Sequence, residues 1–259
     1  MKWSFKRITS SGSFIPEIDG LRFIAIASVI LFHISGFLIE KDHSIYTENI
    51  DYSFFTRLLS HGHLGVPLFF IISGFILALP FAKFHIGKEN PVKLKKYFLR
   101  RLTRLEPPYI LVMTLLLFGS IYVAKSISWN NGIISYLSSL IYSHGFIYEK
   151  GVQPLLNAPA WSLEIEVQFY ILAPLIAYLF AITSSGLRRL SVMVIALLFL
   201  VFNHFNPLPF ISIINYMHYF LMGFLLADLM ISKETIFTKT KFDFLFGLVF
   251  FIIIWIYET

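Results

Sequence analysis

Residues 20–39 read GLRFIAIASVILFHISGFLI, and this stretch decides the fold class. It has about the 20 mostly apolar residues that a helix needs to cross a bilayer, so it predicts the first of several spanning helices. Arg22 and His33 are its only charged or titratable residues, and they stand eleven positions apart. Eleven steps of about 100° make roughly three turns, so the two side chains share one helix face, about 16 Å apart along the axis.

His33 is the first candidate functional residue. An ionisable group inside a membrane is costly and usually has a function, although a hydrogen bond to a neighbouring helix is the alternative explanation. Asp19 and Gly20 precede the apolar stretch and are expected to cap its helix. The stretch lacks a small-residue cleavage site, so we expect a retained span and not a cleaved signal peptide.

The composition predicts an all-α, polytopic transmembrane helix bundle. The 259 residues are 57% hydrophobic and only 14% charged, whereas a soluble domain is about 25% charged. There are no cysteines, which excludes disulfides and thiolate chemistry. We expect a single membrane domain over residues 1–259, with seven spans at residues 21–39, 65–82, 107–124, 166–183, 189–203, 213–231 and 243–257.

The basic residues orient these spans. With a cytoplasmic N-terminus, 17 of the 21 Lys and Arg residues fall on the inner side and four on the outer side. This asymmetry is the positive-inside pattern of membrane proteins. The net charge of +6 therefore reports orientation and does not predict a nucleic-acid partner.

Residues 93–109, KLKKYFLRRLTRLEPPY, predict an amphipathic helix on the inner surface. Arg100 and Arg104 share a face at i, i+4, and Arg101 lies beside them. Pro107 and Pro108 are expected to end this helix before the third span. The arginines favour either an anchor to lipid headgroups or a clamp for a phosphate-bearing ligand, to which the planar guanidinium is suited.

Residues 158–175, APAWSLEIEVQFYILAPL, place a carboxylate at the expected outer start of the fourth span. Glu166 is four residues after Ser162, whereas Glu164 projects about 200° away from Glu166 on the helix. A carboxylate in an apolar helix needs a partner or a function. We expect Glu166 and His33 at a similar depth, where they could act as orienting group and base.

Three weaker patterns predict packing more than chemistry. Residues 65–75, GVPLFFIISGF, bring Ser73 and Gly74 into a span, where small residues allow close helix packing. The His61-x-His63 pair resembles a metal site only faintly, and an ordinary loop is the favoured interpretation. His218 and Asp228 are expected to be packing and inner-rim residues of the sixth span.

Four segments together resemble the acyltransferase-3 family of integral-membrane acyltransferases. They are IDGLRFIAIASVILFH, GVPLFFIISGF, FLRRLTRLEPPY and WSLEIEVQFY, in this order between residues 18 and 170. The resemblance implies transfer of an acyl group, commonly acetyl from acetyl-CoA, to a hydroxyl of a surface or secreted glycan. It also implies the following roles: His33 as the catalytic base with Glu166; Arg22, Arg100, Arg101 and Arg104 as donor-binding residues; and Trp161 and Ser162 as substrate-binding residues.

The chain departs from the family pattern in two places. Pro67 stands where many members have an acidic residue. Members usually have about ten spans, so a chain with seven is expected to lack C-terminal spans of the family.

These observations predict a membrane O-acyltransferase in the cell membrane, in contact with membrane lipids and without a metal. Its donor would be cytosolic acyl-CoA, and its acceptor a carbohydrate or lipid-linked glycan at the outer face. Direct transfer to the acceptor and a covalent acyl-His33 intermediate are both open. One alternative is a transporter or flippase of a lipid-linked sugar. The lack of paired helices broken by Gly or Pro argues against it. The other alternative is an inactive scaffold.

Overall fold

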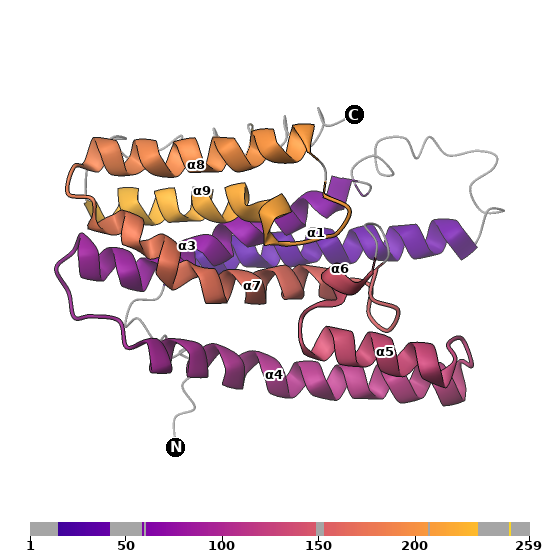
Figure 1. Cartoon of the computed structure of the whole chain (residues 1–259). Coiled ribbons are helices and arrows are strands. Elements are labelled where there is room, and N and C mark those ends of the chain that lie inside the picture. The colour runs from indigo at the N-terminus through magenta and orange to yellow at the C-terminus, as the bar shows by residue number, and fades with distance from the viewer. Residues whose placement is uncertain are drawn as a thin grey trace, which may run out of the picture. The chain divides into compact units, whose positions relative to one another are not determined.

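The computed structural model describes residues 15–41, 59, 61–148, 153–206, 208–232 and 249, and every regular element among them is helical. Figure 1 shows these elements in order. They are α1 (Pro16–Lys41), η1 (His61–Leu64), α3 (Gly65–His85), α4 (Leu94–Phe118), η2 (Gly119–Val123), α5 (Trp129–Leu140), α6 (His144–Ile147), α7 (Ala160–Ile176), η3 (Ala177–Ala181), α8 (Ser185–Phe205) and α9 (Ile213–Ser232).

The all-α, polytopic prediction is confirmed. Six helical segments of the described residues are long and apolar enough to cross a membrane. They contain or overlap the first six predicted spans, and the seventh, residues 243–257, lies outside the described residues. Helix α5, with 12 residues, is too short to cross, and it falls between the third and fourth predicted spans.

The chain divides into two compact units. The described part of the first unit consists mainly of α1, η1 and the start of α3 up to Ile72. Two glycines bring η1 and α3 against α1. A Cβ atom added to Gly62 would lie 2.3 Å from the carbonyl oxygen of Ser28. One added to Gly65 would lie 2.4 Å from the carbonyl oxygen of Ala25. Only glycine fits such close backbone contacts.

The second unit, Ser73–Ser232, holds the rest of α3 and the elements from α4 to α9. Helices α8 and α9 lie side by side (Figure 1). Aromatic rings join α7 and η3 to α9: Phe169 stacks on Phe220 at 4.0 Å between ring centroids, and Phe180 on Phe224 at 5.3 Å. Such pairs add stability beyond the burial of their area.

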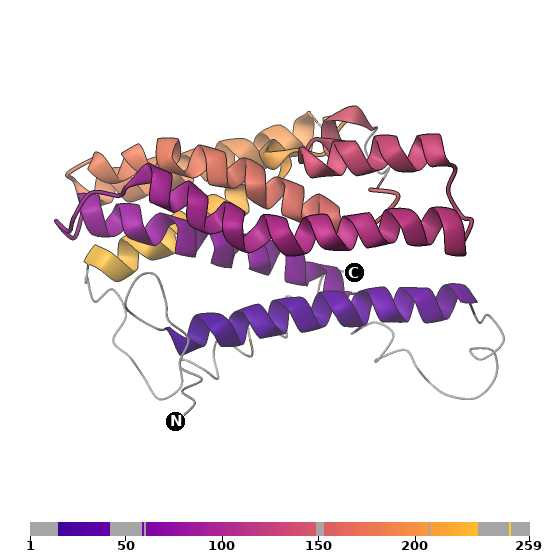
Figure 2. The same ribbon diagram turned by 90° about the horizontal axis from the view of Figure 1, so that it is seen from below.

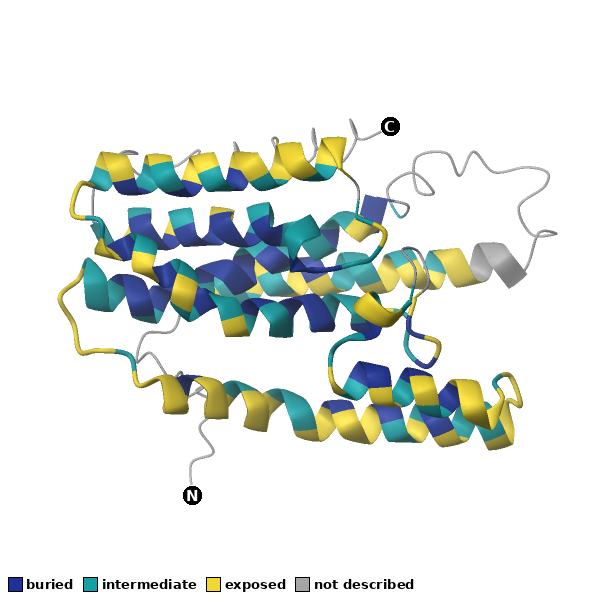
Figure 3. Ribbon diagram, in the orientation of Figure 1, coloured by how far each residue is buried: buried dark blue, intermediate teal, exposed yellow. Residues whose placement is uncertain are grey.

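Helix α8 turns one side to α9 and the other outward. Its outward side is exposed along the whole helix (Figure 3). The exposed side chains are large and apolar, as expected where a helix meets lipid: Leu187, Leu190, Met193, Val194, Leu197, Leu198 and Val201.

Helix α4 corrects one prediction. It runs from Leu94 to Phe118 without ending at Pro107 and Pro108, so the basic segment and the third span form one helix. Proline removes backbone hydrogen bonds, but spanning helices tolerate it where neighbouring groups satisfy the freed carbonyls. The arginines of this segment are therefore rigidly joined to the span.

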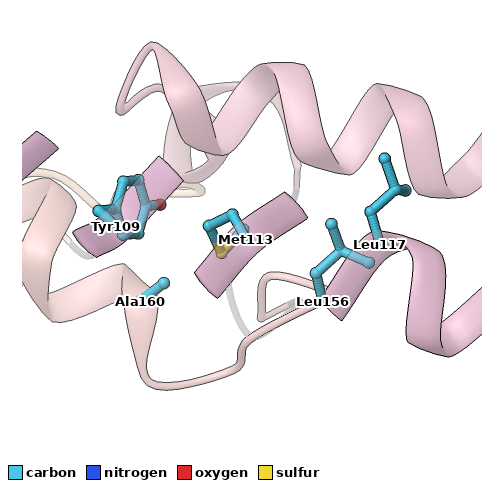
Figure 4. Close-up of a cluster of buried hydrophobic side chains, with 5 residues drawn as sticks. All are labelled: Tyr109, Met113, Leu117, Leu156 and Ala160. Carbon is cyan, nitrogen blue, oxygen red and sulfur yellow. The ribbon is translucent and has the colours of Figure 1, made fainter. Parts of the chain in front are cut away.

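The C-terminal half of α4 packs against α5, which lies alongside it in both views (Figures 1 and 2). This part of α4 contributes Tyr109, Met113 and Leu117 to a buried cluster, which Leu156 and Ala160 from the start of the α7 region complete (Figure 4). Tyr109 thus lies near the first residue of α7, whereas Tyr97 hydrogen-bonds the Tyr170 carbonyl near the end of α7. Helices α4 and α7 are therefore antiparallel.

We expect Gly74 to be a sensitive packing position. A Cβ atom there would lie 2.3 Å from the carbonyl oxygen and 2.9 Å from the Cα atom of Phe220. Gly74→Ala should lower the free energy of unfolding by about 1–3 kcal/mol, because the α9 backbone must move to admit the methyl group. The thermal unfolding midpoint in detergent measures this. Gly119→Ala is the control, because nothing lies within 4 Å of a Cβ atom there. Equal midpoints for the two variants would contradict the prediction.

Candidate functional site

The basic end of α4 carries an arginine that turns inward. The guanidinium carbon of Arg101 lies 3.9 Å from the ring centroid of Tyr97, one turn earlier, and Arg101 also donates to the Tyr97 carbonyl at 3.2 Å. Tyr97 is buried, with 2% of its surface exposed. A cation held over an aromatic face in this way contributes about 0.5–2 kcal/mol, more when it is desolvated.

Helix α7 presents a matching pair. The Tyr170 side chain hydrogen-bonds Glu166, one turn earlier, and its ring lies 5.5 Å from the Arg101 guanidinium. Arg101 interacts electrostatically with Glu166. Two i, i+4 pairs, one on each of two antiparallel helices, thus face each other.

Glu166 is buried, with 7% of its surface exposed. The hydroxyl of Ser73 on α3 donates to its Oε1 at 2.8 Å. A buried carboxylate is costly unless it is paired and hydrogen-bonded, and here a serine, a tyrosine and an arginine share that role. We name these five residues from α3, α4 and α7 the Glu166 cluster: Ser73, Tyr97, Arg101, Glu166 and Tyr170.

The other two arginines of the basic segment point outward. Arg100 and Arg104 are exposed, and Arg100 Nε donates to the Lys96 carbonyl at 3.0 Å. Arg100 and Arg104 therefore share an exposed face of α4, and Arg101 lies beside them on a less exposed face. The exposed pair has donors available for an anionic ligand, next to the inward-facing Arg101.

The depth of Glu166 differs from the prediction. Helix α7 starts at Ala160 and not at residue 166, so Glu166 lies well inside the helix and not at its outer start. Glu166 consequently meets Arg101, which the sequence assigned to a separate donor site.

Trp161 and Ser162 occupy the first turn of α7, at the end of the second unit opposite to Arg101. The Trp161 ring lies 5.3 Å from that of Tyr216 on α9. Ser162 donates to the Pro159 carbonyl at 2.9 Å. Their predicted contact with substrate stays a prediction.

In the first unit, α1 carries Arg22 and His33 as predicted. Arg22 makes an ion pair with Asp19 at 3.9 Å. His33 is exposed, with its ring edge-on to Phe32 at 5.4 Å between centroids. Phe32 also meets the ring of His63 at 5.8 Å. The pairing of His33 with Glu166 stays a prediction, because His33 belongs to the first unit and Glu166 to the second.

The His61-x-His63 pair packs within the first unit. His61 is buried and its ring stacks on His63 at 6.2 Å between centroids. Within the described ranges, no group of three or more His, Cys, Asp or Glu side chains could hold a metal ion.

The sixth-span residues have different environments. Asp228 accepts from Arg188 and from Arg189 Nε, the latter at 2.9 Å, and thereby ties α9 to the start of α8. The sequence did not predict this ion-pair network, and the inner-rim position of Asp228 stays a prediction. His218 has a buried Nδ1 that lacks a hydrogen-bond partner among the described residues.

Sequence reasoning missed Ser73, Tyr97 and Tyr170 as members of the Glu166 cluster. A signal for two of them was present, since Tyr97–Arg101 and Glu166–Tyr170 are both i, i+4 pairs of a tyrosine and a charged residue. No comparable signal identified Ser73, because its neighbour Gly74 already explained a small residue at that point.

The chain is similar to known proteins that are named O-acetyltransferases. O-acetyltransferase OatA of Staphylococcus aureus strain NCTC 8325 / PS 47 is 29% identical over 183 residues, 66% of this chain and 26% of that protein. A putative O-acetyltransferase of S. aureus strain COL is 29% identical over 171 residues, 63% of this chain and 24% of that protein. The chain thus spans about a quarter of the length of these relatives, and no solved structure matches it. The acyltransferase domain family matches residues 15–258, through both units, and the chain belongs to this acyltransferase-3 family.

Proposed function

We propose that this chain is a membrane O-acetyltransferase that moves an acetyl group from acetyl-CoA to a hydroxyl of a carbohydrate or lipid-linked glycan. The observation that carries the proposal is the Glu166 cluster, in which a buried carboxylate lies in electrostatic contact with the basic segment of α4. The matched relatives are named O-acetyltransferases, which supports acetyl as the group transferred. Family membership supports acyl transfer more generally.

The donor would bind at the basic end of α4. Arg100 and Arg104 are exposed there and offer planar donors that suit phosphate. Arg101 lies between this exposed face and Glu166, and Arg22 on α1 is the fourth proposed donor residue. The concentration of basic residues on one side supports a cytosolic orientation of this end, where acetyl-CoA would be available. The proposed location of the protein is the cytoplasmic membrane.

His33 would act as the general base in the transfer step. Its imidazole takes the proton of the acceptor hydroxyl while that oxygen attacks the thioester carbonyl carbon. The carbon–sulfur bond then breaks, and the protonated imidazole returns its proton to the sulfur, which leaves as the thiol of CoA. Glu166 would orient the imidazole and stabilise its charged form, a role that suits a buried carboxylate held in place by Ser73 and Tyr170.

The proposal is tested with the purified protein in lipid nanodiscs. Acetyl-CoA labelled in the acetyl group is mixed with surface glycan from a strain that lacks the gene, and label in the glycan and free CoA are both measured. We expect one CoA released for each acetyl group transferred. No acetyl-CoA consumption, together with transport of a lipid-linked sugar in vesicles, would support the transporter alternative. Absence of both activities would support an inactive scaffold.

We expect the exposed arginines to control donor affinity. The double variant Arg100→Gln, Arg104→Gln should raise the KM for acetyl-CoA by about tenfold or more, because each charge-assisted hydrogen bond to phosphate contributes about 1.5–3 kcal/mol. Added salt should weaken donor binding less in this variant than in the unaltered protein. Steady-state kinetics at two salt concentrations measure both effects.

The matched control is the double variant Lys93→Gln, Lys95→Gln. These residues are also exposed, lie at the start of the same helix and change the net charge equally. If this control raised the KM as much as the arginine variant, the binding would depend on charge alone and the predicted arginine contacts would be wrong.

A further inference from the structure

The end of the second unit opposite to Arg101 contains a junction between three segments. The Gly145 amide of α6 donates to Glu164 Oε2 at 3.2 Å, and the Gly145 carbonyl accepts from the Ile211 amide at 3.2 Å. A Cβ atom at Gly145 would lie 2.4 Å from the Ile211 carbonyl oxygen, so only glycine allows this contact. Helix α6 is thereby fixed to α7 and to the segment before α9.

A second set of hydrogen bonds fixes the segment before α9. Gln168 Oε1 accepts from the Ile213 amide at 2.8 Å, and Asn215 Oδ1 accepts from the Ser212 amide at 2.9 Å. Glu164 and Gln168 are four residues apart, so both project from the same face of α7. We name His144, Gly145, Glu164, Gln168 and Ser212 the α6 junction.

The α6 junction contains four polar atoms without a partner. Glu164 Oε1, His144 Nε2, Gln168 Nε2 and Ser212 Oγ are all buried, and none has a hydrogen bond within the described ranges. His144, Glu164 and Ser212 expose only 1%, 2% and 1% of their surfaces. Buried polar groups in native proteins are almost always satisfied, so four such atoms around one junction indicate that something else binds there.

Glu106, a second carboxylate at this end of the unit, already has a side-chain partner. Tyr142 donates to Glu106 Oε1 at 2.6 Å, and burial together with this hydrogen bond raises the pKa of Tyr142 above its usual value. Glu106 is therefore already paired. Glu164 accepts from the backbone amides of Gly145 and His144, and its Oε1 has no further side-chain partner among the described residues.

The types of the four atoms restrict the ligand. Glu164 Oε1 accepts hydrogen bonds and Gln168 Nε2 donates them, whereas Ser212 Oγ does both. Burial lowers the pKa of His144, so its ring is neutral at pH 7 and Nε2 either donates or accepts. A phosphate would need donors only and would repel Glu164, and a cation would need acceptors only. A hydroxyl, which both donates and accepts, matches the mixed set.

We propose that the α6 junction binds hydroxyl groups of the acceptor carbohydrate, with Glu164 and Gln168 as the central contacts. This inference rests on the proposed function and specifies its acceptor side. Trp161, one turn before Glu164 on α7, lies against Tyr216 and offers aromatic surface of the kind that sugar rings contact. The site lies on α6, on α7 and before α9, away from the arginines proposed to bind the donor.

The test uses Glu164→Gln in the purified full chain, with labelled acetyl-CoA and the surface glycan as probes. We expect the KM for the glycan to rise about tenfold to hundredfold, because the acceptor hydroxyl loses its hydrogen bond to the buried carboxyl group. The KM for acetyl-CoA should stay unchanged. The matched control is Glu106→Gln, which alters a carboxylate at the same end that is already paired with Tyr142.

A second variant separates binding from a structural role. Ser212→Ala removes an unpartnered hydroxyl but keeps the backbone hydrogen bonds of the segment. If Ser212 binds the acceptor, the KM for the glycan should rise severalfold while the thermal midpoint stays equal or rises. Unchanged glycan KM values in both variants, with normal turnover, would overturn the inference and indicate a buried water only. Absence of acetyl-CoA turnover in the unaltered protein would instead refute the proposed function.

Discussion

Replacing His33 by alanine is expected to lower the rate of acetyl transfer by about 10²–10⁴-fold, the usual contribution of a positioned general base. The imidazole is an exposed side chain on α1, so its removal should leave packing and expression intact. The measurement is the initial rate of label transfer from acetyl-CoA to the glycan, at equal amounts of purified protein. The KM for acetyl-CoA should change little, because the base acts in the transfer step.

His204→Ala is the matched control for this prediction. His204 is likewise exposed, and its ring lies edge-on to Phe205 at 5.0 Å, as that of His33 does to Phe32. We expect this variant to transfer acetyl groups at the normal rate. Normal transfer by His33→Ala would refute the base assignment, whereas equal losses in both variants would indicate a general effect of losing an exposed histidine.

The His33→Ala variant also distinguishes direct transfer to the acceptor from transfer through an acetyl-His33 intermediate. With labelled acetyl-CoA and no acceptor, an acetyl-His33 intermediate leaves label on the unaltered protein and none on His33→Ala. Direct transfer leaves no label on either protein. The two routes therefore differ in a quantity that does not depend on which glycan is used.

Asp228→Ala is expected to cause the largest loss of stability, about 3–5 kcal/mol in the free energy of unfolding. Asp228 is 1% exposed and Arg188 is 4% exposed, so the substitution leaves a buried guanidinium without its counter-charge. Arg188 would keep its bond to the Ile182 carbonyl at 2.8 Å, which does not neutralise the charge. The thermal midpoint in detergent, or the urea concentration at half-unfolding, measures the effect.

Asp19→Ala provides the comparison for Asp228→Ala. The Asp19–Arg22 pair spans 3.9 Å and is partly exposed on both sides. Exposed ion pairs contribute about 0–1 kcal/mol, so this variant should unfold at nearly the normal midpoint. Similar losses in the two variants would show that burial does not determine the contribution of Asp228.

The sequence predicted the spans well because their signal is one-dimensional. About 20 apolar residues in a row and the distribution of Lys and Arg need no knowledge of tertiary contacts. Two of the predicted helix boundaries were wrong. Pro107 and Pro108 were expected to end a helix that continues through them, and the start of α7 was placed six residues too late.

The candidate site was predictable as a set of residues but not as an arrangement. Motifs identified Arg101 and Glu166 separately, but their contact depends on the antiparallel packing of α4 and α7, which no local pattern encodes. Ser73 joins them only through the approach of α3 to α7. The pairing of His33 with Glu166 stays a prediction for the same reason, since it requires the relative placement of two units.

Helix α7 also acts as a partition. Glu164 and Glu166 are two residues apart, about 3 Å along the axis, but Glu164 binds α6 and Glu166 binds α3. A helix backbone whose amides and carbonyls are already hydrogen-bonded to one another separates the two carboxylates and offers no chain of polar groups between them. Glu164 and Glu166 therefore belong to two separate groups of hydrogen bonds, and a substitution of either carboxylate leaves the partners of the other in place.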